Sequence, residues 1–265
     1  MAGFADFCAD YFHQYFELHP TDAIYYGIEG YDHLLNDYSD ASYEAEKRFV
    51  ENSLTALRRI PTTDLTQDEA IDHALLEGKL TIQNYEQAKE DYRLKQPDSY
   101  SPIDAIYILT VRATNDFPGN LLSRLNGVPA VLRQGIANLG RAAANPPKLW
   151  TENAIEGAKG SLSFLDGLPS HPKVQAAALD AIALAAAIAK AKDALNDFAT
   201  FLERELLPRS RGVYAVGEEH FNLLLRKKHF LDHNAQTLLA LGEDLFRDTK
   251  QELLALAEAL APGKG

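Results

Sequence analysis

Two histidines near the C-terminus, His229 and His233, have the spacing of a zinc-binding pair. They lie four residues apart in HFLDH, so on one continuous helix both imidazole rings would share a face. With an acid before the second histidine, the stretch is similar to the inverted zincin pattern H-x-x-E-H. It does not fit the ordinary zincin pattern H-E-x-x-H, because Phe230 occupies the position of the glutamate. Asp232 and Asn234 are typical helix caps, so we expect the histidines to lie in different segments and to bind no metal. A complete metal enzyme using this pair is therefore the third and weakest interpretation.

The sequence contains no other pattern that identifies a catalytic group. The chain contains no G-x-S-x-G elbow, no P-loop and no dinucleotide-binding G-x-G-x-x-G, and its other histidines lack ligand spacing. Glu218 and Glu219 begin a predicted helix, where the helix dipole alone favours acids. The single cysteine, Cys8, excludes an internal disulfide and a cysteine-based zinc site, and we interpret it as a buried inert thiol.

Composition limits the class of protein. The chain has 265 residues, of which 46% are hydrophobic and 24% charged, and this is typical of a globular protein with a sizeable core. Its net charge of -12 argues against nucleic acid or an anionic membrane as a partner, because both need clustered Lys and Arg. The acidic N-terminus, MAGFADFCADYF, lacks the features of a secretory signal. We expect a cytoplasmic protein, or a periplasmic or secreted one if a signal peptide has been removed.

The elements that position these residues are all predicted to be helices. No run alternates apolar and polar residues convincingly, so the sequence predicts an all-α, irregular multi-helix bundle forming one domain over residues 1–265. Other helices are predicted at about 3–18, 21–26, 42–59, 66–92, 102–109, 118–126, 129–144, 151–165, 218–228 and 234–261. Ser39 or Ser42 is the expected cap of the helix that ends at Arg59, and the stretch from Thr66 to Glu69 resembles a capping box.

The bundle is predicted to surround one long alanine-rich helix over residues 172–207. This stretch has no glycine and no internal proline, and at 1.5 Å per residue it would extend roughly 50 Å. Ser170 is the expected N-cap, Pro172 suits the first turn and Pro208 ends the helix. A stripe of residues recurs every three or four positions: Val174, Ala178, Ile182, Ala185, Ile188, Lys192, Leu195, Phe198, Leu202 and Leu206.

Several stretches, weak singly but ordered along nearly the whole chain, together resemble one bacterial family, domain of unknown function 885. The matching stretches are HPTDAIYYGIEGYDHLLNDYS, LTQDEAIDHALLEGKL, LLSRLNGVPAVLRQGIANL, LERELLPRSRG, GEEHF and LLALGEDLFRDTKQEL. The fifth is similar to a G-x-E-x-Tyr element of the family, with Phe221 in place of the tyrosine.

The resemblance implies a function for the whole protein rather than for this chain alone. Members of the family are mostly much longer and resemble helical zinc metallopeptidases, whose zinc motif, H-E-x-x-P-G-H-H, lies in the C-terminal half. This chain has no such motif. The resemblance therefore implies an N-terminal fragment of a longer protein: the non-catalytic helical half of a zinc-dependent peptidase-like hydrolase. No cofactor is expected in this chain, and zinc is expected only in the missing C-terminal half. A shortened natural paralogue is the less favoured interpretation.

On this interpretation the chain supplies one wall of a substrate channel, built from the long helix and the stretch that follows it. The residues expected there are Tyr214, Arg209, Arg211, Glu219 and His220. An arginine pairs well with a peptide carboxylate, and a tyrosine hydroxyl donates to a developing oxyanion. The alternative for each is a solvent-facing or capping role. No catalytic residue and no metal ligand are predicted.

The expected partners follow from the same interpretation. They are the C-terminal half of the parent protein and a peptide-like substrate, with a homodimer through exposed apolar surface as a further expectation. The rival from another class is a self-contained helical binding or interaction module.

Overall fold

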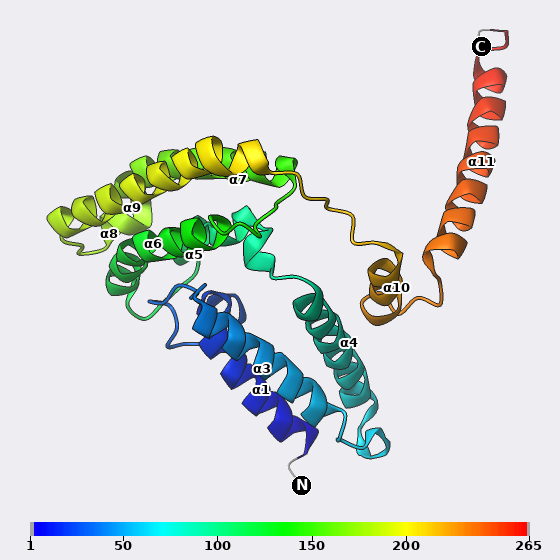
Figure 1. The fold of residues 1–265 in the computed structure, drawn as a ribbon, viewed down its shortest axis with the longest axis horizontal. Helices are drawn as coiled ribbons and strands as arrows, with labels where there is room; N and C mark the ends of the chain where they lie inside the picture. Colours follow the sequence, from blue (N-terminus) through cyan, green and yellow to red (C-terminus); the bar gives the residue numbers. More distant parts are fainter. Residues whose placement is uncertain (1–2, 264–265) are drawn as a thin grey trace. The chain divides into compact units, whose positions relative to one another are not determined.

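The computed structural model describes residues 3–263, which divide into two compact units (Figure 1). Unit 1 contains the described residues up to Leu65 together with Asn84–Tyr214. Unit 2 contains Thr66–Gln83 and the described residues from Ala215 onward. Helix α4 (Gln67–Lys89) contributes residues to both units. The single domain over residues 1–265 therefore stays a prediction.

The prediction of an all-α fold is confirmed, since residues 3–263 contain helices and turns and no strand. Unit 1 contains α1 (Phe4–Leu18), α2 (Pro20–Ala23), α3 (Asp40–Leu57), α5 (Ile103–Val111), α6 (Phe117–Leu139), α7 (Lys148–Gly167), α8 (Pro172–Ala176) and α9 (Ala181–Phe201). Unit 2 contains the first part of α4, with α10 (Glu218–Lys227) and α11 (Ala235–Leu260). None of the helices in the described part of the chain has the length and apolar character needed to cross a membrane.

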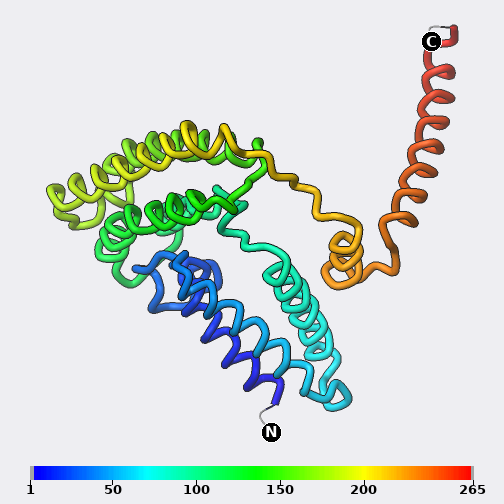
Figure 2. Tube along the Cα trace, in the orientation of Figure 1, coloured from blue at the N-terminus to red at the C-terminus, as the bar shows by residue number. Residues whose placement is uncertain are grey.

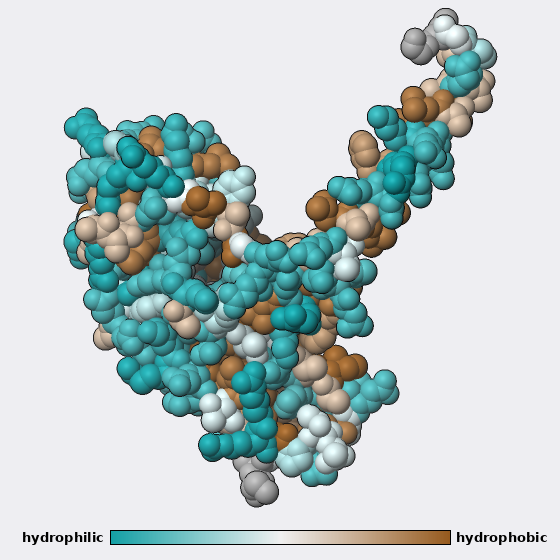
Figure 3. Space-filling model, turned by 45° about the vertical axis from the view of Figure 1, so that its right-hand side comes forward, coloured by the Kyte–Doolittle hydropathy of each residue, from teal (hydrophilic) through white to brown (hydrophobic). Residues whose placement is uncertain are grey.

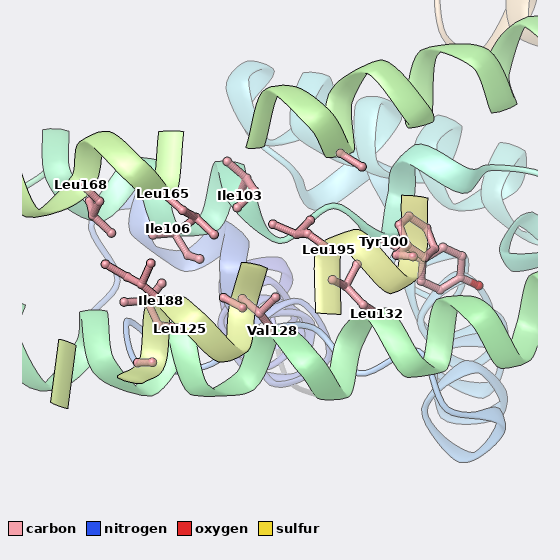
Figure 4. Packing of buried hydrophobic residues seen from close by; sticks show 14 of the residues in the cluster. Tyr100, Ile103, Ile106, Leu125, Val128, Leu132, Leu165, Leu168, Ile188 and Leu195 are labelled. Atoms are coloured by element: carbon pink, nitrogen blue, oxygen red, sulfur yellow. The ribbon is translucent and has the colours of Figure 1, made fainter. Parts of the chain in front are cut away.

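The core of unit 1 lies between α6, α7 and α9, which run along one another (Figures 1 and 2). Leu125, Val128 and Leu132 project from one face of α6 toward Ile188 and Leu195 of α9 (Figure 4). All five side chains are buried, and burying one such side chain stabilises a fold by about 1.5–3 kcal/mol. Alanines of α9 are buried among them, so the α9 backbone approaches its neighbours closely. The predicted helix break near residue 127 is wrong, because α6 continues through Pro129.

The prediction of one continuous helix over residues 172–207 is wrong. The helix ends at Ala176 and starts again at Ala181, because the Asp180 carboxylate accepts hydrogen bonds from the backbone N–H groups of Ile182 (2.9 Å) and Ala183 (3.3 Å). An aspartate is far more stabilising as an N-cap than inside a helix, so it interrupts the alanine-rich run.

The two ends of that stretch also differ from the sequence prediction. The N-cap of α8 is His171 rather than Ser170, with its Nδ1 accepting from the N–H of Lys173 at 3.2 Å. At the other end, α9 widens into a π-helical turn over Leu202–Leu206, just before Pro208. A proline has no N–H and clashes with the carbonyl four residues earlier, and a wider turn accommodates both effects.

Candidate functional site

The first motif of the sequence, residues 19–39, forms an irregular segment of unit 1 between α1 and α3. It begins with α2 and a 3₁₀ turn (Ile24–Tyr26) and then continues without regular structure to Tyr38. Gly27 (φ 69°) and Gly30 (φ 97°) both adopt left-handed backbone conformations that side chains disfavour. These two glycines let the chain turn and run back along α6.

Main-chain atoms of this segment attach it to α6. The Ser123 hydroxyl donates to the carbonyl of His33 at 2.8 Å. The N–H of Tyr38 donates to the Gln134 side chain at 2.9 Å, and the Asn138 amide donates to the carbonyl of Tyr38 at 2.9 Å. Three side chains of one helix therefore fix the position of the segment.

Two polar cavities lie against the segment and share Asn36 and Tyr38 in their walls. The first has a volume of about 190 Å³ and is also lined by Thr21, Asp22, Tyr25, Leu35, Ser101, Pro102, Asp104, Ala105 and Val131. The second has a volume of about 210 Å³ and is also lined by Leu18, His19, Asp37, Ser42, Glu46, Tyr92 and Ser99. Their walls therefore combine carboxylates, hydroxyls and aromatic rings, a mixture suited to a small polar ligand.

The hydroxyl and amide groups of the first cavity hold one another in fixed positions. The Tyr15 hydroxyl donates to the Asp22 carboxylate at 2.6 Å, and the Thr21 hydroxyl donates to Asn36 at 3.0 Å. The Tyr38 hydroxyl donates to the carbonyl of Ser99. Burial raises the pKa of Tyr38, and burial followed by the hydrogen bond to Asp22 raises the pKa of Tyr15. Both tyrosines therefore stay protonated and act as hydrogen-bond donors near neutral pH.

A histidine–glutamate pair lines the second cavity. Nε2 of His19 lies 3.8 Å from Oε1 of Glu46, and their side chains are only 21% and 11% exposed. The Gln87 amide donates to the same carboxylate oxygen at 3.4 Å, and the Tyr15 ring packs against the imidazole with its centroid 4.6 Å away. The arrangement keeps a buried carboxylate beside an imidazole. It suits binding of the cationic or hydrogen-bonding end of a ligand.

Two buried arginines lie close to the cavities. The guanidinium of Arg93 contacts the carboxylates of Asp91 at 2.7 Å and Asp40 at 2.9 Å, and donates to the carbonyl of Tyr38 at 3.1 Å. Arg124 is fully buried, and its Nη1 donates to the carbonyl of Ala105. Burial lowers the pKa of Arg124 to about 10. Both arginines support the walls of the site, and neither of them lines the first or the second cavity.

Three of the five residues predicted to contact substrate belong to unit 1. Arg209 donates from Nη1 to the carbonyls of Arg141 (3.1 Å) and Ala144 (3.4 Å), and from Nη2 to the carbonyl of Leu139 at the end of α6. Its guanidinium therefore caps the Leu139 carbonyl at the end of α6 and joins it to the turn that follows, where the Arg141 carbonyl also accepts from the N–H of Ala144. Arg211 and Tyr214 are exposed, and the Tyr214 side chain has 68% of its surface accessible. Substrate binding by these three residues stays a prediction.

The other two predicted residues, Glu219 and His220, lie in the first turn of α10 in unit 2. Glu219 is exposed and His220 is half-buried. An acid in this turn is favoured by the helix dipole, in line with the capping alternative. Their role in substrate binding also stays a prediction.

The separation of the two spaced histidines is confirmed. His229 follows the end of α10, and His233 precedes Asn234, whose side chain accepts from the N–H of Thr237 at 2.9 Å as the N-cap of α11. Across residues 3–263, no group of three or more His, Cys, Asp or Glu side chains is arranged to hold a metal ion. Cys8 is half-buried rather than fully buried as expected.

Sequence reasoning missed the cavity residues. The available signal was a run of His, Asp, Asn and Tyr side chains around turn-forming glycines, in a segment too irregular to be a helix. The opposite walls come from Ser99 and Asp104, more than sixty positions further along the chain, and no local pattern marks them.

Comparisons with known proteins agree on the fold. The sequence profile of a family described as bacterial protein of unknown function (DUF885) matches residues 20–265. A solved structure from Shewanella oneidensis, described as a putative lipoprotein of unknown function, is similar with a TM-score of 0.83 and 20% sequence identity. The similarity covers 99% of this chain and 49% of that chain, so this chain spans about half the length of its structural neighbour. A comparison with curated proteins finds no match.

Proposed function

Because this chain belongs to the bacterial family DUF885, we propose that it is the helical, non-catalytic half of a zinc-dependent peptidase-like hydrolase. In this proposal the chain holds a peptide-like substrate, and the zinc and its reaction belong to a C-terminal half that completes the protein. The observation that carries the substrate-holding role is the pair of polar cavities that share Asn36 and Tyr38.

The chemistry of the cavity walls supports a peptide as the ligand. A peptide presents an ammonium group, amide N–H groups and carbonyls at short intervals. The carboxylates of Asp22 and Glu46 match the ammonium and the N–H groups, and the Asn36 amide can accept or donate. Because hydrogen bonds to α6 and to the carbonyl of Ser99 already fix the segment, little conformational entropy is lost on binding.

The five residues predicted to line a substrate channel differ in whether they can contact a ligand. Arg211 and Tyr214 are exposed and able to reach a ligand. Arg209 instead caps α6 and would act by fixing the chain that carries the other two. Glu219 and His220 lie in the first turn of α10 in unit 2, and their contact with substrate stays a prediction.

Calorimetric titration of the 265-residue chain with tetra-alanine tests the proposal. We expect saturable binding, weakened about tenfold by Glu46→Gln, since a hydrogen bond to a charged group contributes about 1.5 kcal/mol more than none. The matched control is Glu51→Gln, which changes an exposed glutamate of the same helix and should leave binding unchanged. N-acetylation of the peptide should weaken binding in the wild type. Absence of binding, or hydrolysis of the peptide by this chain supplied with zinc, contradicts the proposal.

The second candidate function is a self-contained helical binding module. The observation that favours it is α11, whose apolar side chains are exposed along its length. A chain that binds a protein partner through α11 and ignores tetra-alanine would support this candidate over the first.

A further inference from the structure

Helix α11 has apolar side chains that unit 2 leaves exposed over most of the length of the helix. The helix begins at the cap Asn234, runs for 26 residues and has no buried residue. Figure 3 shows hydrophobic side chains exposed along it. Its exposed large apolar residues are Leu239, Leu241, Leu245, Phe246, Leu253, Leu254, Leu256 and Leu260. Contiguous apolar surface of this kind marks an interaction site.

Five leucines of α11, together with Gly242 and Thr249, follow an 11-residue repeat. A central stripe recurs at spacings of four, three and four residues, twice in succession: Leu238, Gly242, Leu245, Thr249, Leu253, Leu256 and Leu260. With 100° per residue, all seven positions fall within about 40° of one line along the helix. A repeat of 11 residues keeps the stripe of one helix against the stripe of another over its whole length if the pair winds into a gentle right-handed supercoil. The pattern is therefore that of a helix that pairs lengthwise with another helix.

The charges beside the stripe identify the partner and its direction. Lys250 lies on one flank near the middle of the helix, and Asp248 and Glu252 lie on the opposite flank. In a parallel, in-register pair of two α11 helices, opposite flanks meet, so each Lys250 faces the two acids of the other copy. In an antiparallel pair each flank meets itself, and the acids would repel one another. The helix is thus complementary to itself in the parallel arrangement.

We infer that α11 is a dimerisation helix that packs parallel and in register against α11 of a second copy of this chain. Five leucine positions of the stripe meet their equivalents, and Gly242 has open space around it that lets the two backbones approach. This inference goes beyond the proposed substrate-holding function and is independent of it, because peptide binding in unit 1 and association through α11 are measured separately.

Sedimentation velocity over a range of concentrations measures the association. The wild-type chain is a dimer, and Leu253→Glu raises the dissociation constant roughly 100-fold or more, since each copy loses a buried leucine and gains a buried charge. The matched control is Leu254→Glu, a neighbouring and similarly exposed leucine that lies about 140° away from the stripe. Its dissociation constant stays within about threefold of the wild type. A monomeric wild-type chain, or equal effects of the two substitutions, overturns the inference.

Two further measurements test the parallel direction. In a Cys8→Ser background, Leu256→Cys forms a disulfide-linked dimer under mild oxidation, because in-register residues are adjacent only in a parallel pair. Lys250→Glu alone weakens the dimer, as does the double change Asp248→Lys with Glu252→Lys. A mixture of these two variants forms a mixed dimer, since opposite charges again face each other. A dimer that fails to cross-link overturns the parallel pairing, and circular dichroism of each variant verifies that α11 is folded.

Discussion

The buried guanidinium of Arg124 provides a quantitative test of the energetics of unit 1. The perturbation is Arg124→Met, which keeps a long side chain and removes the charge. Within residues 3–263, Nε and Nη2 of Arg124 have no hydrogen-bond partner, and Nη1 donates to the carbonyl of Ala105. Ala105 lies inside α5, where its carbonyl is also placed for an intrahelical hydrogen bond. Removing the guanidinium therefore leaves no new unpaired group.

The expected change in the free energy of unfolding is small because two terms oppose each other. Burial lowers the pKa of Arg124 to about 10, so the charged form destabilises the folded state, by roughly 3 kcal/mol at neutral pH. The methionine variant removes this penalty but loses a charged hydrogen bond that contributes about 1.5–3 kcal/mol. We expect a net change below about 1.5 kcal/mol in either direction. In the wild type the penalty applies at all pH values below about 10 and fades as the pH rises through that value.

Urea denaturation at pH 7, followed by circular dichroism, is the assay. The comparison variant is Arg124→Ala, which leaves a cavity and should lose about 2–5 kcal/mol of stability. If methionine destabilises as much as alanine at an unchanged denaturant slope, the reasoning is wrong. The charge would then be stabilised in the folded protein by Asp32, whose carboxylate raises the pKa of Arg124. Asp32→Asn would in that case destabilise the wild type and leave the methionine variant unaffected.

Three other substitutions test local structure by denaturation and hydrogen exchange. Gly78→Ala should destabilise the contact between α4 and α10 by about 1–3 kcal/mol, because a Cβ there would overlap the carbonyl oxygen of Lys227; the higher helix propensity of alanine offsets part of this loss. Amide protection in α10 should fall. The control Gly157→Ala has open space around the new Cβ and should be neutral or stabilising. Asp180→Ala should cost about 0.5–2 kcal/mol through the lost N-cap, and a stability gain would show that the alanine-rich run prefers to continue as one helix. Arg209→Lys should lower the free energy of unfolding by about 1–3 kcal/mol, because one ammonium group cannot donate to all three carbonyls in the same geometry. Unchanged stability together with weaker peptide binding would instead favour the predicted contact of Arg209 with substrate.

Local signals in the sequence were sufficient for the beginnings of α3 and α4. Ser39 accepts from the N–H of Ser42 as the N-cap of α3. Thr66 and Glu69 form the expected capping box, with distances of 2.9 Å and 3.3 Å between their side-chain oxygens and backbone nitrogens. A cap acts within one turn of helix, so four consecutive residues of the sequence are enough to predict it.

Interruptions inside helical runs and the candidate site were not predictable in the same way. Asp180 lies in a run whose neighbours favour helix, so helix propensity alone did not reveal that it acts as a cap. The cavities depend on contacts between distant residues, such as the Tyr38 hydroxyl with Ser99 and the Asn138 amide with Tyr38. Such pairings are set by tertiary structure, and a single sequence without periodicity carries no trace of them.

The attachment of the motif segment to α6 has a consequence for how its specificity can change. At His33 and Tyr38, the hydrogen bonds to α6 use carbonyl oxygens and an N–H of the segment, which every amino acid except proline supplies. Side chains such as Tyr25 and Leu35, which line the first cavity, can therefore be exchanged while the main chain keeps its course. Mutation can redirect the cavities toward a different ligand in small steps, each of which leaves the scaffold intact, and the same property makes this segment a practical starting point for engineering new recognition.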